Sequence, residues 1–238
     1  MNLIQFIDQK YYQDYTDHWD DKLFRKRLLQ YIGPNSTVLD VGAGAGIVRE
    51  MNFKDIAKQV CGIDPDERVV ENPYLHEAHV GLADNIPYPD STFDVVFADN
   101  VLEHLPNPHL VFTEIRRVLK PGGVFLAKTP NSWHYMPVIS RITPLAFHRY
   151  INKIRGREVE DTFPTCYAAN SHSAINQLSK KTGFTPVFIE RHEGRPEYLR
   201  MLAITYVVGM AYERIVNAFN KLERFRILLI ICLRKPES

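Results

Sequence analysis

The sequence predicts an α/β fold, a doubly wound sheet of about seven strands with helices on both faces. Three observations support this prediction. Apolar runs of strand length alternate with helical segments through the first 130 residues. The run at 37–41 ends in a glycine-rich turn, which is typical of a strand that leads into a helix. The chain has 238 residues, 45% of them hydrophobic, so one sizeable core and a single domain over 1–238 are expected.

The expected elements follow in chain order. A helix is expected over 9–32, and its early part carries four aromatic residues, Tyr11, Tyr12, Tyr15 and Trp19. Strands are expected at about residues 37–41, 58–63, 76–81, 93–98, 124–129, 184–191 and 226–233. The turn at 120–123, Lys-Pro-Gly-Gly, stops the helix before the fifth strand. Another helix over 171–182 has Ser171 as its cap and Gly183 as its stop.

Three segments are additions to this core: an N-terminal helical cap at 1–32, an insertion at 131–170 and an insertion at 196–224. The insertion at 131–170 follows the fifth strand, and ligands of open α/β sheets sit at the carboxyl ends of the strands. We therefore expect it to be a substrate lid. From Arg141 to Arg157 it carries five Lys/Arg residues and no acid, which fits either a solvated face or a pocket for an anionic acceptor.

The insertion at 196–224 contains an almost uninterrupted apolar run from Met201 to Tyr212. A helix that is apolar all round is normally buried. Twelve residues span only about 18 Å as a helix, which is too short to cross a bilayer. The run therefore predicts a buried helix, a contact with a second subunit in a homodimer, or a peripheral contact with a membrane surface.

The stretch at 38–46, Val-Leu-Asp-Val-Gly-Ala-Gly-Ala-Gly, is the most informative part of the chain. Glycines at Gly42, Gly44 and Gly46 leave the backbone bare, so a ligand can approach it closely. The spacing is not that of a dinucleotide fingerprint, because the next required glycine is replaced by Ile47. Asp40 would repel a pyrophosphate and instead suits a ligand with an amino acid part. The alternative is an ordinary tight turn between a strand and a helix.

Polar residues follow the next two strands at positions that suit a nucleoside. Asp64 ends the second strand, where an acid is placed to accept both ribose hydroxyls. Asp84 and Asn85 can hydrogen-bond an adenine edge. Local roles compete with both interpretations, since these side chains also cap helices and form Asx turns.

With the further segments Val-Leu-Glu-His at 101–104 and Leu-Lys-Pro-Gly-Gly at 119–123, the chain resembles the class I S-adenosylmethionine-dependent methyltransferases over roughly residues 30–130. The resemblance implies a Rossmann-like sheet, mostly parallel with an antiparallel edge strand, and S-adenosylmethionine as cofactor with S-adenosylhomocysteine as product. It implies that Asp40, Gly42 and Gly44 contact the methionine part. It further implies that Asp64 binds the ribose, that Asp84 binds the adenine, and that Asn100 lies beside the methionine moiety.

Methyl transfer needs alignment of the acceptor more than acid–base chemistry, although an oxygen or nitrogen acceptor can require a base. His104, after the fourth strand, is the first candidate for that base, and His134, after the fifth, is the second. A helix-start histidine bonded to the backbone is the alternative for His104. Related quinone-precursor enzymes carry a further acid where this chain has Asn100. Glu103 and His104 alone are a poor site for a hard divalent ion, and no metal is expected.

The resulting functional prediction is a methyltransferase that acts on a small-molecule or lipid-precursor acceptor, with oxygen as the acceptor atom. A net charge of +1 and the absence of an added RNA-binding module argue against a nucleic-acid partner. The three cysteines form no C-x-x-C pair and no signal peptide is visible, so a cytoplasmic protein is expected, with membrane association as the alternative. A nucleotide-binding protein without methyltransferase activity, and a nucleic-acid or protein methyltransferase, remain as alternative functions.

Overall fold

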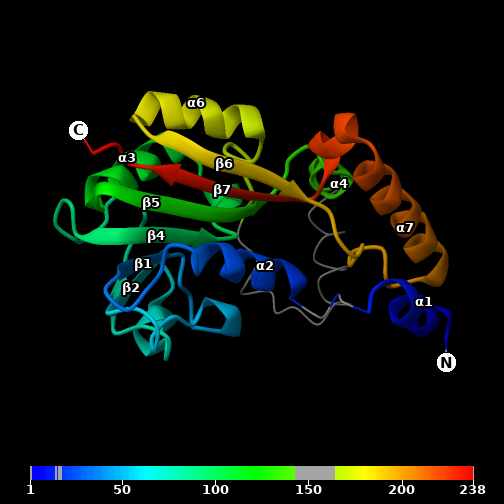
Figure 1. The fold of residues 1–238 in the computed structure, drawn as a ribbon, viewed down its shortest axis with the longest axis horizontal. Coiled ribbons are helices and arrows are strands. Elements are labelled where there is room, and N and C mark those ends of the chain that lie inside the picture. The colour runs from blue at the N-terminus through cyan, green and yellow to red at the C-terminus, as the bar shows by residue number, and fades with distance from the viewer. Residues whose placement is uncertain (1, 14, 16–17, 143–163, 238) are drawn as a thin grey trace. The chain divides into compact units, whose positions relative to one another are not determined.

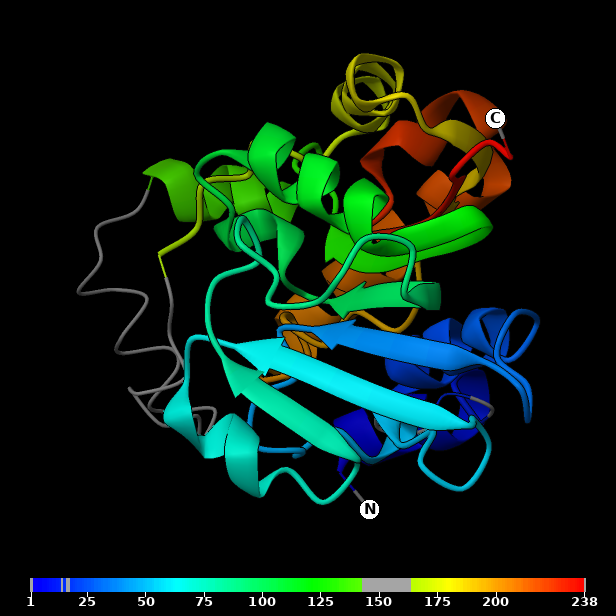
Figure 2. The same ribbon diagram turned by 90° about the vertical axis from the view of Figure 1, so that its left-hand side faces the viewer.

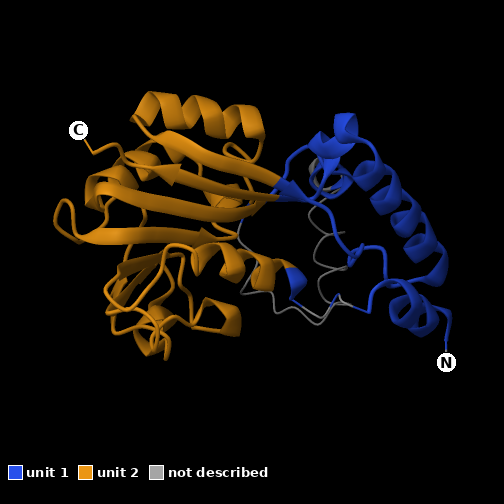
Figure 3. Cartoon of the chain, in the orientation of Figure 1, with its two compact units in different colours: residues 1–19, 130–164, 191–228 blue, residues 20–129, 165–190, 229–238 orange. Residues whose placement is uncertain are grey.

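The computed structural model describes residues 2–13, 15, 18–142 and 164–237. Its contacts divide the chain into two compact units (Figure 3). Unit 2 consists of residues 20–129, 165–190 and 229–238 and contains most of the sheet. Unit 1 is assembled from residues 1–19, 130–164 and 191–228. Each unit is therefore built from segments that lie far apart in the sequence.

The sheet has seven strands in the order β3-β2-β1-β4-β5-β7-β6, which confirms the predicted doubly wound fold. The β1–β2, β1–β4, β2–β3 and β4–β5 pairs are all parallel, and Figure 2 shows the first strands side by side. The one strand that runs against its neighbours is β7, which lies between β5 and the edge strand β6 (Figure 1). The strand bounds are β1 Thr37–Val41, β2 Gln59–Asp64, β3 Glu77–Val80, β4 Phe93–Asp99, β5 Leu119–Pro130, β6 Thr185–His192 and β7 Leu228–Arg234.

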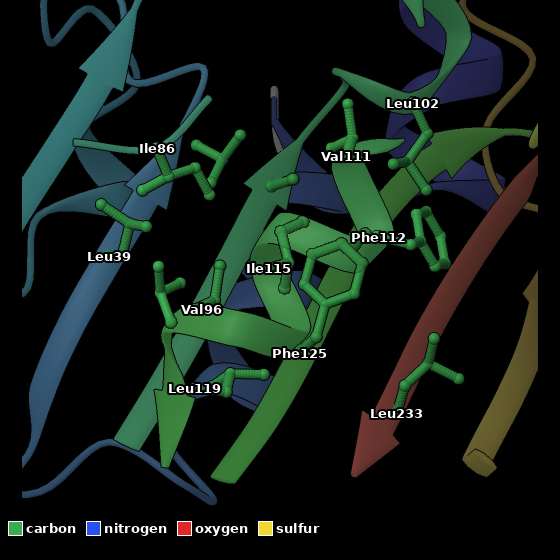
Figure 4. Close-up of a cluster of buried hydrophobic side chains, with 14 of the residues drawn as sticks. Leu39, Ile86, Val96, Leu102, Val111, Phe112, Ile115, Leu119, Phe125 and Leu233 are labelled. Atoms are coloured by element: carbon green, nitrogen blue, oxygen red, sulfur yellow. The ribbon is translucent and has the colours of Figure 1, made fainter. Parts of the chain in front are cut away.

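Both faces of the central strands are buried, which is why these strands read as continuous apolar runs. Val96 and Phe97 are neighbours in β4 and point to opposite faces of the sheet. Val96 joins a core cluster with Phe112 and Ile115 of helix α3 (Pro108–Val118) (Figure 4). On the other face, Phe97 makes edge contacts with Phe24 of helix α2 (Trp19–Leu28) and with Phe53.

Helix α6 (His172–Thr182) has the predicted ends. The Ser171 side chain accepts a hydrogen bond from the backbone N–H of Ala174, and Gly183 adopts a left-handed conformation at φ +74°. The connections from β1 to β2 and from β2 to β3 carry only short 3₁₀ turns, η1 (Arg49–Met51) and η2 (Glu67–Glu71). Another 3₁₀ turn, η3 (Leu102–His104), follows β4.

The single helix expected over 9–32 is wrong, because the structure has two helices there. Helix α1 (Leu3–Tyr11) starts earlier, at a capping box in which Asn2 and Gln5 exchange side-chain hydrogen bonds with each other's backbone N–H. It ends at Tyr12, whose backbone leaves the helical region. Helix α2 then begins at Trp19, directly after His18, which has φ +63°. The aromatic pattern is continuous through this break, so it does not reveal the end of α1.

Unit 1 contains α1, α4 (Tyr135–Ile142), α7 (Ala203–Ala218) and the 3₁₀ turn η5 (Asn220–Phe225). Helices α1 and α7 pack through a small core of Ile7, Tyr12 and Tyr206. Of the expected lid at 131–170, residues 143–163 lie outside the described residues, including most of its Lys/Arg positions. Helix α7 covers most of the apolar run at 201–212 but starts at residue 203 and extends to 218.

Candidate functional site

A pocket lies at the carboxyl end of β1, within unit 2. The main chain from Gly42 to Val48 forms one wall, and two carboxylates, Asp40 and Asp99, line it from the ends of β1 and β4. Register brings these acids together, because β1 and β4 are parallel neighbours whose carboxyl ends share one edge of the sheet. The remaining lining residues are Met51, Asn72 and Tyr74.

The glycine-rich wall is held open by backbone conformations that favour glycine. Gly42, Gly44 and Gly46 have φ of +80°, +49° and +74°. A Cβ added at Gly44 would meet no heavy atom within 4 Å, so this wall faces open space. The Asn72 side chain donates hydrogen bonds to the carbonyls of Ala43 and Gly44 at 2.9 and 3.1 Å and so supports the loop.

The two carboxylates of the pocket differ in their neighbours. Burial raises the pKa of Asp40 well above its usual range, and the nearby charges of Asp99 and Asp64 raise it further. Burial also raises the pKa of Asp99 to about 6, although the ammonium of Lys128 opposes that rise. Lys128 is paired with Asp99 across β4 and β5, at 2.9 Å from its carboxylate. Asp99 is thus paired with the buried Lys128, whereas the described residues show no ion pair for Asp40.

The sequence-predicted cofactor residues fall into three groups. Asp40, Gly42 and Gly44 line the pocket. Asp64 is not a lining residue, but its carboxylate accepts a hydrogen bond from the backbone N–H of the lining residue Gly44 at 2.9 Å and another from that of Asp66 at 2.8 Å. Three residues, Asp84, Asn85 and Asn100, are exposed and are not among the residues that line the pocket.

Outside the glycine-rich loop, sequence reasoning missed four residues of the pocket, Met51, Asn72, Tyr74 and Asp99. Asp99 directly precedes the predicted Asn100, and the alternation of side chains along the strand decides which of the two faces the pocket. Asn100 itself adopts φ +55° as the chain leaves β4. Asn72 and Tyr74 follow η2, and no local pattern links that segment to the glycine-rich loop.

The predicted base His104 is half-buried at the end of η3 in unit 2. Its neighbour Glu103 is buried and accepts a hydrogen bond from the Thr129 hydroxyl at 2.9 Å. The Thr129 hydroxyl in turn accepts one from the Asn170 amide at 2.6 Å. Glu103 therefore has a structural partner, and the segment that carries His104 is tied to the end of β5 and to the start of α6.

The second predicted base, His134, is buried in unit 1, and its ring centroid lies 3.9 Å from that of Tyr135 at an interplanar angle of 42°. Its Nε2 lies 3.5 Å from the Glu193 carboxylate and has no hydrogen-bond partner among the described residues. Burial lowers the pKa of His134 to about 3 and raises the pKa of Glu193 to about 8. At neutral pH the histidine is therefore uncharged, and the carboxyl group of Glu193 is largely protonated.

The charged residues that line the pocket indicate which class of cofactor it can bind. Among the described residues that line it there are two acids and no Lys or Arg. A pyrophosphate would face uncompensated repulsion from both acids, whereas a ligand with a cationic amino acid part is attracted. The bare glycine main chain allows such a ligand to approach closely. The residues present therefore fit S-adenosylmethionine, which carries an ammonium and a sulfonium, and do not fit a dinucleotide.

Residues 39–127 match the model of a methyltransferase domain, and this range contains the whole pocket. This stretch of the chain is therefore similar to the domain of S-adenosylmethionine-dependent methyltransferases. A probable S-adenosylmethionine-dependent methyltransferase of Mycolicibacterium smegmatis is 38% identical over 147 residues, which cover 56% of each chain. A ubiquinone biosynthesis O-methyltransferase of Maricaulis maris is 31% identical over 40% of each chain.

The fold of this methyltransferase domain also occurs in solved structures of low sequence identity. The crystal structure of the [4+2]-cyclase SpnF superposes with a TM-score of 0.59 at 20% identity, covering 92% of this chain and 82% of the other. The chain spans about half the length, or less, of the curated relatives described above. The matches therefore establish the domain and its fold, and a cyclase on the same fold shows that the fold alone does not define a reaction.

Proposed function

We propose that this protein transfers a methyl group from S-adenosylmethionine to the oxygen of a small-molecule or lipid-precursor acceptor. The observation that carries the proposal is the pocket itself, in which bare glycine main chain adjoins two acids and no lining cation. The methyltransferase domain match over 39–127 covers every residue of that pocket. The Maricaulis maris relative is named as an O-methyltransferase of ubiquinone biosynthesis, which supports oxygen as the acceptor atom and a lipid-like acceptor.

Within this proposal each residue has a binding role. Asp40, Gly42 and Gly44 hold the methionine part, and Asp99 adds a second carboxylate for its ammonium group. Asp64 binds the ribose at the edge of the pocket, while Asp84, Asn85 and Asn100 contact the adenine and methionine ends. When bound, the cofactor supplies a methyl group that its sulfonium makes electrophilic. The chain's own task is to orient the acceptor in line with that methyl group and to exclude water.

A base is needed only if the acceptor hydroxyl must lose its proton. His104 is the first candidate because it lies in η3, directly after β4 in the unit that holds the pocket. His134 is the second candidate, although burial lowers its pKa to about 3, which makes it a weaker base than an ordinary histidine. The Lys/Arg residues from 141 to 157 favour an anionic acceptor.

Calorimetry with S-adenosylmethionine, S-adenosylhomocysteine and NAD tests the cofactor assignment. Binding of the first two but not of NAD is the expected result, and NAD binding alone would contradict it. Transfer of labelled methyl is then measured to panels of phenolic lipids, amines, proteins and nucleic acids. Label on a phenolic lipid supports the proposal, whereas label on protein or nucleic acid favours the corresponding alternative. Cofactor binding without transfer to any panel would favour a nucleotide-binding protein without methyltransferase activity.

A further inference from the structure

Helix α7 of unit 1 buries two hydrogen-bonding side chains together with Gly209 and Val216, and it leaves several large apolar side chains exposed. Its buried positions include Tyr206 and Glu213. The Tyr206 hydroxyl donates to Asp8 of α1 at 2.5 Å. Glu213 accepts hydrogen bonds from the Tyr12 hydroxyl at 3.2 Å and from the Asn217 amide at 2.8 Å. These contacts fix which side of α7 faces α1.

The outward side of α7 is a continuous apolar stripe. Ile204 is 81% exposed, Val208 is 60% exposed, and Phe219, at the end of the helix, is also 60% exposed. Positions 204, 208, 211, 215 and 219 are spaced three or four residues apart, so they share one face of the helix. We call these five residues, Ile204, Val208, Ala211, Ile215 and Phe219, the α7 apolar face. An exposed apolar stripe of this length marks an interaction site, not an isolated surface residue.

Basic and aromatic side chains also occur on two further elements of unit 1, helix α1 and the turn η5 that directly follows α7. The segment from 195 to 226 carries six Lys/Arg residues and three Glu. Three of these cations are in ion pairs, since Arg195 pairs with Glu197, Arg200 with Asp8 and Arg214 with Glu213. Glu223 pairs with Arg191, outside the segment, so Lys221, Arg224 and Arg226 are the cations that lie outside these pairs. The ammonium of Lys10 lies over the rings of Phe6 and Tyr11, and the guanidinium of Arg224 lies over Phe225. Cations beside aromatic rings around an apolar stripe are typical of helices that lie in a lipid–water interface.

We propose that the α7 apolar face lies in the surface of an anionic lipid membrane. The sign of the charge on Lys221, Arg224 and Arg226 favours this occupant over a second copy of the chain. In a two-fold dimer both copies would bring the same basic residues toward one interface, where they repel each other. An anionic membrane instead attracts them, by about five-fold in affinity for each Lys or Arg near the surface. The described helices include none that is long and apolar enough to cross a membrane.

The inference goes beyond the proposed methyl transfer and does not depend on it. It is tested by flotation of the full chain with vesicles of phosphatidylcholine, with and without phosphatidylserine. We expect binding that requires phosphatidylserine and weakens between about 0.1 M and about 1 M salt, as the Debye length falls from about 10 to about 3 Å. Replacing both Lys221 and Arg224 by Ala should weaken binding about 25-fold, at about five-fold for each charge.

A matched pair of variants separates the α7 apolar face from general effects of added charge. Val208→Glu should reduce vesicle binding at least ten-fold, because a carboxylate is driven out of the interface. Val187→Glu introduces the same change at an exposed valine of β6 and should bind as the wild type does. Circular dichroism and calorimetry with S-adenosylhomocysteine confirm that each variant is folded and retains its cofactor site, so a failed lipid test does not bear on the methyl transfer proposal.

Three results would overturn the inference. The first is a wild-type protein that ignores phosphatidylserine vesicles at low salt. The second is equal vesicle binding by Val208→Glu and by the wild type. The third is a dimer in light scattering that Val208→Glu dissociates while neither protein binds vesicles, which would assign the face to a second copy of the chain.

Discussion

Asp40 is buried and lines the pocket with Asp99, and the ammonium of Lys128 forms an ion pair with Asp99. The raised pKa of Asp40 means that its charged form is disfavoured in the folded protein without ligand. Such a group adds stability below its unfolded pKa and loses that contribution as the pH rises through its folded pKa. A cationic ligand reverses this cost, because it supplies the missing partner.

We expect Asp40→Asn to raise the melting temperature of the free protein at neutral pH and to weaken S-adenosylhomocysteine binding at least ten-fold. Removing a buried, poorly compensated charge stabilises the fold, while a charged hydrogen bond to ligand is worth about 1.5–3 kcal/mol. Calorimetric titration and thermal unfolding measure the two effects. Asp90→Asn, at an exposed acid, is the matched control and should change neither. Unchanged affinity in Asp40→Asn would remove this residue from the cofactor site.

Glu193 and His134 form a second buried pair of titratable residues, in unit 1. Glu193 also accepts a hydrogen bond from the Ile227 backbone N–H at 2.9 Å. The pKa of Glu193 is raised to about 8, so its contribution to stability is complete below about pH 4.5 and is lost as the pH rises through 8. The pKa of His134 is lowered to about 3, so its contribution is present above about pH 6.5 and is lost as the pH falls toward 3.

The wild-type protein should therefore lose stability between about pH 6.5 and pH 8, and Glu193→Gln should abolish much of that loss. The difference over this range is about 2 kcal/mol, since one pKa unit corresponds to about 1.4 kcal/mol. Thermal unfolding of both proteins across this range is the measurement. Glu197→Gln, at a more exposed acid of the same segment, should follow the wild type. Parallel profiles for wild type and Glu193→Gln would show that Glu193 is ionised throughout.

In the glycine-rich loop after β1, two nearby glycines have different roles, since one contacts the protein and the other faces open space beside the pocket. A Cβ at Gly46 would collide with the Asn72 side chain, which supports the loop. A Cβ at Gly44 would enter open space beside the pocket. Both residues have positive φ, so either substitution carries a conformational cost of about 1–2 kcal/mol.

Gly46→Ala is expected to destabilise the protein more than Gly44→Ala, because only Gly46→Ala adds a collision to the backbone cost. Gly44→Ala should still fold but lose affinity for S-adenosylhomocysteine, since its methyl group occupies space that the ligand needs. Urea unfolding and calorimetry on the two variants provide the comparison, and each variant is the control for the other. The reverse order in either measurement would mean that the ligand does not approach the main chain at residue 44.

Lys128 connects three elements of unit 2. Its ammonium is fully buried and forms ion pairs with Asp99 of β4 and with Asp20 and Asp21 of α2. Burial by itself would lower the pKa of Lys128, but the three carboxylates raise it above its usual range. The same lysine thus positions a carboxylate of the pocket and attaches α2 to the carboxyl edge of the sheet.

Lys128→Met should destabilise the protein by about 3–5 kcal/mol, because it leaves buried carboxylates without a cation. The control is Lys120→Met, since Lys120 lies on β5 as Lys128 does but pairs with Asp94 of β4 through a side chain that is 40% exposed. This substitution should lower the free energy of unfolding by less than about 1 kcal/mol. Denaturant unfolding of the two variants provides the test. Equal losses in both would show that the Lys128 cluster is no stronger than a surface ion pair.

For the whole molecule, all residues that line the pocket belong to unit 2, while α1, α4 and α7 belong to unit 1. A ligand stabilises the part of the chain whose folded state binds it. We therefore expect S-adenosylhomocysteine to slow hydrogen exchange in residues 40–48 and 72–74 and to leave α7 unchanged. Mass spectrometry of exchanged peptides, with NAD as the control ligand, measures this. Equal protection of α7 would show that the two units respond to the ligand as one body.

Much of the fold is determined by local sequence. The strands at 37–41 and 93–98 were predictable because both faces of a central parallel strand are buried, which leaves an apolar run. Helix α6 was predictable because Ser171 and Gly183 satisfy its ends through short-range contacts. Asp40, Gly42 and Gly44 were found for the same reason, since a strand end and its glycine turn are adjacent in sequence.

The tertiary structure alone decided which distant side chains meet. Asp99 lies beside Lys128 through strand register, and Asn72 reaches the glycine loop across almost thirty residues. No local pattern encodes such pairs, because periodicity reports the face of an element and not its neighbour. For the same reason, the sequence did not predict the break between α1 and α2 or the exposure of the α7 apolar face. Sequence periodicity thus determined the strands and the glycine turn, whereas long-range packing decided which acids share a cation and which apolar surface stays exposed.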